Sequence, residues 1–276
     1  DCKPCEEQEP GMVGYSVDYS RVNLLLQDTP IAYAPPIGRS IRLAVNYSHR
    51  EVAAAATPRY SHLGPKWNLN CVAFILDNPS NPNSTKSYGP GGGLLLYNGY
   101  DSMTGKWAVQ PLTGAKLQRF AGPPVTYERT YPDGSRQVFG LADTSTPKQV
   151  FLTESYDPQG NVTTYTYDPS TFRLLSITDG LGQVTAFAYV SNDSMDVANY
   201  FRVASITDPF GRAATFNYNA GGQLWKITDP VGIVSEFAYG AGDFIREMTT
   251  PYGVTKFLAS DWGLDRRVDI NTPDGG

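Results

Sequence analysis

The chain has 276 residues, 41% of them hydrophobic and 12% aromatic, and its 18 tyrosines against 4 methionines favour a β-sheet protein over a helical bundle. The formal net charge is -5 and no stretch is rich in lysine or arginine, which argues against a nucleic acid or an anionic membrane as partner. The sequence lacks a run of about 18 apolar residues, so no membrane-spanning segment is predicted.

The first residues, 1–13, are predicted to form an N-terminal tail that carries Cys2 and Cys5. Their C-x-x-C spacing is that of a redox pair or of half a zinc site. The acidic run 6–10 offers no helix start behind the pair, and no second C-x-x-C completes a zinc site. Three alternatives stay open: a strapped or disordered tail, with or without a local Cys2–Cys5 disulfide, which is favoured; a link to another chain or to a missing neighbouring segment; and a metal site.

Residues 14–120 contain short β-type runs bounded by Gly, Pro, Asn or Asp, and Cys71 lies in an apolar run that predicts a buried thiol. The helix-like run 51–56 is too short for more than one or two turns. We predict one continuous β structure, in which irregular residues 14–120 cap a regular array at 121–276. Strands are expected at 21–26, 40–47, 71–76, 93–97, 106–110, 116–120 and 135–139.

A four-residue turn recurs six times in the second half, with Asp or Thr first, Pro usually second and Gly fourth. Its glycines stand at 160, 182, 211, 232, 253 and 275, which are 22, 29, 21, 21 and 22 residues apart. This composition is typical of a type I turn, and the period predicts a stack of β-hairpins. The structural turn residues are Asp157, Gly160, Asp179, Gly182, Asp208, Gly211, Asp229, Gly232 and Gly253.

Two aromatic residues, spaced two apart, recur in the strand that follows each of four turns. Period two places each pair on one face of the sheet, where stacked repeats are expected to align them into an aromatic ladder that forms the core. A lone hairpin is marginal in water, so the stack is expected to fold as a unit. The ladder residues are Tyr165, Tyr167, Phe187, Tyr189, Phe216, Tyr218, Phe237 and Tyr239.

Two segments are predicted surface loops: the insertion 190–199, which lengthens one repeat, and the loop-like region 77–93. Catalysis has weak support, because His49 and His62 are the only histidines and no G-x-S-x-G motif accompanies them. The repeated aspartates could also be calcium ligands, but the turn explains them better, since Thr replaces Asp at positions 250 and 272. We assign no catalytic, cofactor or metal residue.

The repeats resemble those of the Rhs or YD-repeat family, named for the Tyr-Asp pair seen here as Tyr156-Asp157 and Tyr167-Asp168. Segment 206–212 is similar to the family's unit, and 43–48 with 63–70 is similar to the region that precedes the repeats in bacterial Rhs proteins. The resemblance spans about residues 15–275. It implies a curved, spiralling antiparallel sheet that forms part of a hollow shell, as in Rhs toxins, the C component of insecticidal toxin complexes and teneurins.

By this resemblance the chain is expected to be a non-catalytic part of a secreted or cell-surface shell that encloses or displays a C-terminal toxin or effector cargo. The last turn stops before its return strand, so a longer polypeptide is expected. The alternative is a binding module that engages a cell-surface protein, a glycan or another copy of itself through exposed strand edges or loops. An enzyme is the third and least favoured class.

Overall fold

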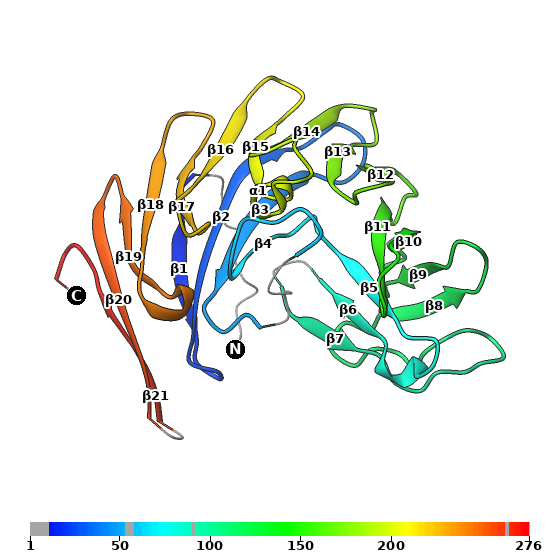
Figure 1. Ribbon diagram of the computed structural model, residues 1–276. Coiled ribbons are helices and arrows are strands. Elements are labelled where there is room, and N and C mark those ends of the chain that lie inside the picture. Colours follow the sequence, from blue (N-terminus) through cyan, green and yellow to red (C-terminus); the bar gives the residue numbers. More distant parts are fainter. Residues whose placement is uncertain (1–10, 53–57, 90–91, 263–264, 276) are drawn as a thin grey trace.

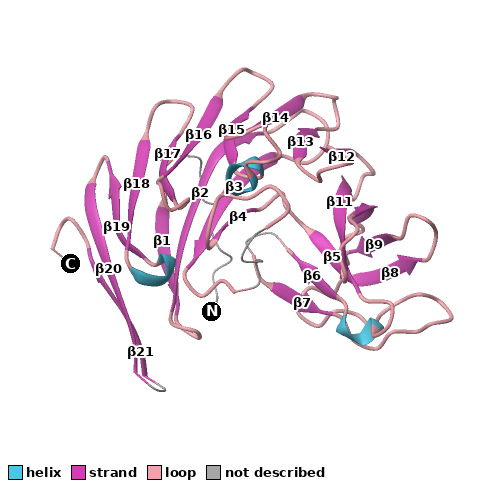
Figure 2. Ribbon diagram, in the orientation of Figure 1, coloured by secondary structure: helices cyan, strands magenta, loops and turns pink. Residues whose placement is uncertain are grey.

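The structure is a computed structural model that describes residues 11–52, 58–89, 92–262 and 265–275. The fold is all-β, as predicted, with one large antiparallel sheet and a smaller sheet against it (Figures 1 and 2). The helical elements of the described part are single turns: α1 (Val197–Tyr200), η1 (Pro82–Ser84) and η2 (Ala241–Asp243). No helix in this part is long and apolar enough to cross a membrane.

The smaller sheet contains the first strands of the chain in the order β1-β2-β3-β4, and all its pairs are antiparallel. We call it the inner sheet, because Figure 1 shows it on the concave side of the curved large sheet. Its strands are β1 (Gly14–Asp18), β2 (Asn23–Tyr33), β3 (Ile41–Ser48) and β4 (Trp67–Leu69).

The large sheet contains all the later strands, and we call its part from β12 to β21 the repeat strip. The first group is β5 (Phe74–Asp77), β6 (Lys86–Tyr88), β7 (Leu94–Leu96), β8 (Lys116–Phe120), β9 (Thr126–Thr130), β10 (Arg136–Ala142) and β11 (Lys148–Tyr156). The strip is β12 (Val162–Tyr167), β13 (Leu174–Thr178), β14 (Val184–Tyr189), β15 (Val203–Thr207), β16 (Ala213–Tyr218), β17 (Leu224–Thr228), β18 (Val234–Tyr239), β19 (Ile245–Thr250), β20 (Gly253–Trp262) and β21 (Asp265–Asn271).

Each strand of the repeat strip pairs with the next strand in sequence, as expected for stacked hairpins. The join to the first half lies at β11. Its residues 154–156 pair with β12, whereas residues 148–151 pair with β5. One strand therefore serves both halves of the large sheet.

Hydrophobic residues form two cores. The larger core lies between the inner sheet and the repeat strip and contains, for example, Leu26 and Val45 from one side and Ile206 and Phe216 from the other. The second core fills the lobe of β5 to β11 around Trp107 and other buried side chains. Residues 14–120 were expected to cap the array. Within them, β1 to β4 lie across the face of the repeat strip, because its apolar side needs a second layer to exclude water.

The strand expected at 106–110 does not form. Lys106 makes isolated bridges with Asp101 and Gln118, and the chain turns at Gly105 and Gly114, both with positive φ. Most of the expected helix-like run 51–56 lies within residues 53–57, and Cys2 and Cys5 lie within residues 1–10. Both lie outside the described residues.

Candidate functional site: the concave face of the repeat strip

The turn aspartates fix the hairpins of the repeat strip through their side chains. Asp208 Oδ1 accepts hydrogen bonds from the N–H groups of Phe210 and Arg212, both at 2.9 Å. The same pattern, to the second and fourth residues on, occurs at Asp157, Asp179 and Asp229. The fourth-position glycines 160, 182, 211 and 232 have φ between +80° and +91°, which favours Gly. Gly253 differs, with φ +123°, and opens β20 directly.

Three of these aspartates are more deeply buried than turn residues usually are, because β2 runs beside them. Asp179, Asp208 and Asp229 are less than 10% exposed. Asp28 of β2 is buried as well, and its burial, with a smaller effect of the Asp229 charge, raises its pKa to about 6. Within the described residues, no three or more acidic, histidine or cysteine side chains are grouped to hold a metal ion.

The predicted ladder residues all point toward the larger core, where they are buried or partly buried. They do not form a stack of touching rings. Phe187 pairs across the strands with Ile206, Phe216 with Ile227, and an aliphatic side chain thus separates one ring from the next. Strands of equal type lie about 9.6 Å apart, beyond the usual 4.5–7 Å between ring centroids. The eight residues therefore lie in a row on the core face of the sheet, with aliphatic residues between the rings.

The second tyrosine of each pair has a further role that the sequence analysis missed. Tyr189 Oη donates to the carbonyl of Leu174 and Tyr218 Oη to that of Val203, both at 2.7 Å and both fifteen residues back. Tyr239 Oη makes the same bond to Leu224. Each accepting residue, Leu174, Val203 or Leu224, lies at a register shift between its own strand and the strand before it, where a bulge disrupts the ladder. In three repeats the tyrosine hydroxyl bonds to the carbonyl at that bulge.

Tyr167 occupies the equivalent position in the first repeat, but its buried hydroxyl has no hydrogen-bond partner in the described part of the chain. Tyr189→Phe should therefore lower the free energy of unfolding by about 1–3 kcal/mol, since it strands a buried carbonyl, whereas Tyr167→Phe should leave it unchanged or raise it. Urea denaturation of both variants measures the difference. Equal losses would show that the hydroxyl bond does not stabilise the repeat.

The inner sheet and the segment after it supply partners for backbone N–H groups that the same bulges expose. Ser61 Oγ accepts from Leu174 N (2.8 Å), and the His62 carbonyl accepts from Val203 N (3.1 Å). Tyr47 Oη accepts from Ile245 N (3.1 Å) and donates to the Asp243 carbonyl (2.9 Å). Specific hydrogen bonds thus join the N-terminal part of the chain to the concave face of the repeat strip. A single side chain such as Ser61 in a loop gives no sequence signal of this role.

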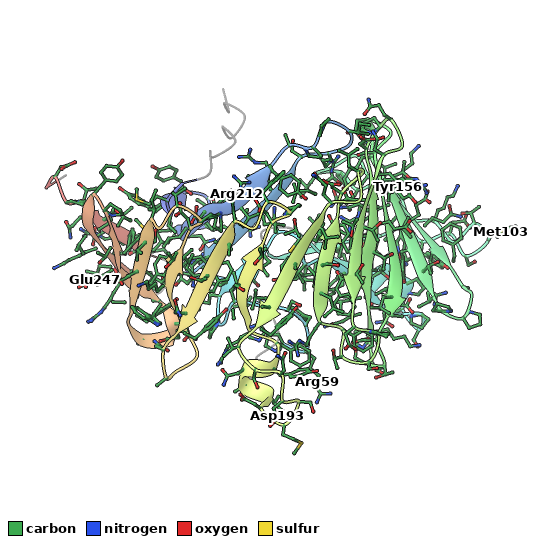
Figure 3. The ribbon with its side chains drawn as sticks, turned by 90° about the horizontal axis from the view of Figure 1, so that it is seen from above. Arg59, Met103, Tyr156, Asp193, Arg212 and Glu247 are labelled. Atoms are coloured by element: carbon green, nitrogen blue, oxygen red, sulfur yellow. The ribbon has the colours of Figure 1, made fainter. Side chains whose placement is uncertain are left out.

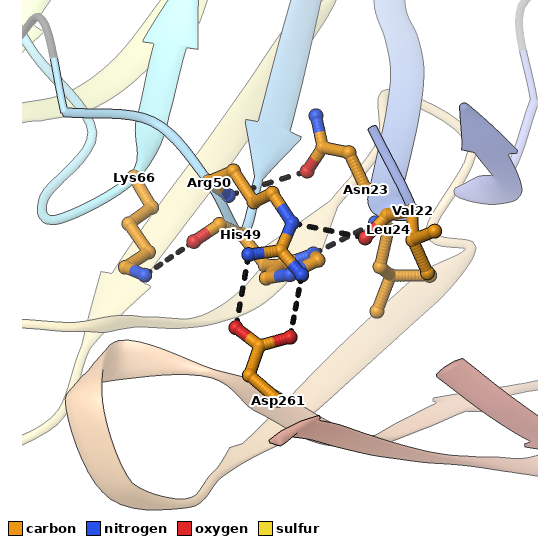
Figure 4. Close-up of polar contacts among 7 residues, drawn as sticks. All are labelled: Val22, Asn23, Leu24, His49, Arg50, Lys66 and Asp261. Carbon is orange, nitrogen blue, oxygen red and sulfur yellow. Dashed lines mark hydrogen bonds and ion pairs between the residues drawn. The ribbon is translucent and has the colours of Figure 1, made fainter. Parts of the chain in front are cut away.

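His49 lies at one end of this interface, in a cluster shown in Figure 4. Its Nδ1 accepts a hydrogen bond from the N–H of Leu24 (2.7 Å), and its carbonyl accepts one from Lys66. The neighbouring Arg50 makes a bidentate ion pair with Asp261 of β20. Its Nη1 donates to Asp261 Oδ2 (3.1 Å) and its Nη2 donates to Asp261 Oδ1 (2.8 Å). The cluster ties the inner sheet to the far end of the repeat strip.

Neither histidine is placed as a general base. His62 Nδ1 accepts from Gly64 N (2.9 Å), as His49 Nδ1 does from Leu24, so protonation of either ring would break a backbone hydrogen bond. Burial lowers the pKa of both imidazoles to about 4, with Arg50 adding to the effect at His49 and Arg202 at His62.

These pKa values predict loss of stability in acid. Between pH 6.5 and 4 the unfolded state binds more protons at each histidine, so the free energy of unfolding should fall as the pH falls, by up to about 3 kcal/mol per imidazole. Asp28 acts in the opposite sense, because below pH 6 the folded state keeps its proton better. The variant His49→Asn/His62→Asn, whose amide oxygens still accept the N–H bonds, should show a flatter profile in urea denaturation. An unchanged slope would contradict this account.

The insertion 190–199 leaves the strip between β14 and β15, and Figure 3 shows Asp193 at its projecting tip. Asn199 Oδ1 accepts from Arg202 (2.7 Å), and the Arg173 guanidinium stacks on Tyr189 and Tyr200 at its base. A groove of about 770 Å³ runs between it and β16. The loop region 77–93 includes η1, β6 and a smaller cavity beside residues 145–148.

These features define an all-β hairpin-repeat protein whose concave face is covered by its own N-terminal strands. No protein-family model matches the chain, and no curated protein matches it. Among solved structures, the crystal structure of TcdB2-TccC3 is similar with a TM-score of 0.37 and 10% identity, over 97% of this chain and 16% of that chain. The N-terminal domain of the effector protein SpvB from Salmonella typhimurium strain LT2 has a TM-score of 0.33 and 9% identity, over 87% of this chain and 97% of that one. The chain thus spans 16% of the length of the first structure.

Proposed function

We propose that the chain is a non-catalytic structural segment of a secreted or exported Rhs-type β-shell that encloses or displays a C-terminal toxin or effector cargo. The observation that carries the proposal is the repeated unit itself. Four repeats have the same turn and the same aromatic pair, and three of them have the same tyrosine-to-carbonyl bond. Such a unit adds area to a curved wall without adding a reactive group.

The proposal also includes what covers the concave face of the wall. The inner sheet covers the concave face of β12 to β20, through contacts such as Tyr47 with Ile245 and Arg50 with Asp261. Cargo therefore would not contact these strands directly. This segment acts as a double-layered part of the wall, and the cargo space is formed by other parts of the shell.

The first experiment is the intact mass of the native polypeptide from its source, followed by limited proteolysis. A product several times heavier than 30.2 kDa, with a C-terminal part protected from protease until the shell is denatured, would support the proposal. A product near 30.2 kDa, or a C-terminal part cut at the rate of an unfolded chain, would contradict it.

A second candidate is an extracellular binding or self-assembling module, which the groove beside the insertion favours. Met195 in the insertion is 85% exposed, so a partner bound at the insertion could contact it. For such a module, Met195→Asp should abolish binding to a glycan array or to cells and leave the melting temperature unchanged. Met103→Asp, at an equally exposed site in another loop, is the matched control, and gel filtration reports self-assembly.

A further inference from the structure

The second core contains a buried arginine without an acidic partner. Arg129 of β9 is 4% exposed, and its guanidinium carbon lies 5.0 Å from the centre of the Phe139 ring. Its Nη1 donates a hydrogen bond to Tyr131 Oη (3.3 Å), and its Nη2 donates one to Ser87 Oγ. Both acceptors are neutral hydroxyl groups. The positive charge of Arg129 is therefore hydrogen-bonded on this side but not compensated.

The carboxylates of the same lobe are bound to other arginines. Asp77 accepts from Arg119 Nε at 2.9 Å. Glu128, the residue before Arg129, points to the opposite face of β9 and accepts from Arg136 Nη1 at 3.1 Å. In the part of the chain that the structure describes, no carboxylate makes an ion pair with Arg129. A buried charge without a counter-ion strongly destabilises a core, so a counter-ion is expected here.

Two buried donor groups in this lobe have no hydrogen-bond partner in the described structure. One is Arg129 Nε, and the other is the hydroxyl of Tyr97, which directly follows β7 and is 1% exposed. Burial raises the pKa of Tyr97, and the Arg129 charge opposes that rise, so the phenol lies within the field of the guanidinium and keeps its proton at neutral pH. Buried donors seldom remain without an acceptor.

The register of the β6–β7 hairpin turns Tyr97 and Ser87 to the same side. Ser87 pairs with Leu95, and the Tyr97 N–H donates to the Thr85 carbonyl (2.9 Å), which continues the ladder by two residues. Because side chains two residues apart share a face, Tyr97 and Leu95 lie on the face that carries Ser87. Ser87 Oγ on that face already contacts Arg129. The two unpartnered donors therefore converge between the hairpin and β9.

We propose that a halide ion, chloride in ordinary salt solutions, binds between Arg129 Nε and the Tyr97 hydroxyl. The ion accepts a hydrogen bond from each donor and compensates the guanidinium charge. A water molecule would also accept both bonds, but it would leave the charge uncompensated and would need acceptors for its own two protons. Both donors are buried, which favours a monatomic ion over an organic acid. The ion would join β9 to the β6–β7 hairpin.

Urea denaturation of the full chain tests the proposal when sodium gluconate is replaced stepwise by sodium chloride at constant ionic strength. Gluconate is too large for a buried site of this kind. Above the dissociation constant of chloride, each tenfold rise in its concentration should raise the folding equilibrium constant by about tenfold, because the ion binds only the folded chain. Bromide should act in the same way, and crystals grown in bromide should show its anomalous signal between Arg129 and Tyr97.

Tyr97→Phe should weaken the chloride affinity by about tenfold, as expected for loss of one hydrogen bond to a charged group. Its hydroxyl has no protein partner, so this variant should fold even where Arg129→Met does not. Tyr127→Phe is the matched control: Tyr127 is equally buried in the same lobe, but its hydroxyl donates to Asp77, so the chloride dependence should remain. Equal stability in chloride and gluconate, as for a bound water, would overturn the proposal. So would an undiminished chloride dependence in Tyr97→Phe.

Discussion

Replacing Phe216 by alanine should lower the free energy of unfolding of the whole chain by about 3–5 kcal/mol. The Phe216 side chain is 2% exposed, lies in the middle of β16 and packs in the larger core between the two sheets. Alanine would leave a cavity there that neither sheet can close, because each is held by its own strand pairs. Urea denaturation followed by circular dichroism measures the loss.

The control is Asn217→Ala, one residue on, whose side chain is exposed on the opposite face of the same strand. It should change the free energy of unfolding by less than about 0.5 kcal/mol. A loss at Phe216 no larger than that at Asn217 would mean that the concave face of the strip is not a packed core. Adding Tyr218→Ala to Phe216→Ala should deepen the loss, because the Tyr218 hydroxyl bond to Val203 also disappears.

The variant Arg119→Met should cost about 3–5 kcal/mol, because it leaves a buried carboxylate without its cation. Asp77 at the end of β5 is 4% exposed and accepts hydrogen bonds from Arg119 Nε (2.9 Å) and Nη2 (3.2 Å) of β8. The hydroxyl of Tyr127 in β9 donates to the same carboxylate. This network joins three strands of the second lobe, so its loss should destabilise that lobe.

The double variant Asp77→Asn/Arg119→Met separates charge from packing. It removes both charges and keeps an acceptor for Tyr127, so it should recover most of the lost free energy of unfolding. Thermal unfolding of the single and double variants provides the cycle. If the double variant were as unstable as Arg119→Met, the loss would come from the arginine's packing and not from the stranded charge.

The repeat strip was predictable because its signals are local. An Asp side chain that bonds its own turn, a Gly with positive φ at 160 or 211, and an alternation such as that of 184–189 are all set by neighbours a few residues away. These features predicted the hairpins and the all-β class. The interleaving of Phe187 with Ile206 was missed, because the spacing of strands was not included when the aromatic pairs were aligned.

The position of the inner sheet was not predictable in the same way. The strand-like run at 40–47 is consistent with a cap, an edge strand or a covering layer, and only contacts with residues far along the chain distinguish them. The hydrogen-bonding roles of Ser61 and Tyr47 depend on such contacts. Short strands such as β4 and β6, with three residues each, carry too few residues for a periodic pattern.

The contacts that cover the concave face also affect the order in which the chain can fold. Tyr47 contacts Ile245, 198 residues later, and Arg50 contacts Asp261, 211 residues later. At about 5–20 residues per second, a ribosome needs roughly 10–40 s to make that stretch, and until then the N-terminal strands lack their partners. Most repeat proteins can start folding at any repeat, whereas the contacts of Tyr47 with β19 and of Arg50 with β20 have a high contact order, so we expect them to form late in folding. Such a delay would keep the concave face of the repeat strip uncovered while the polypeptide is being made.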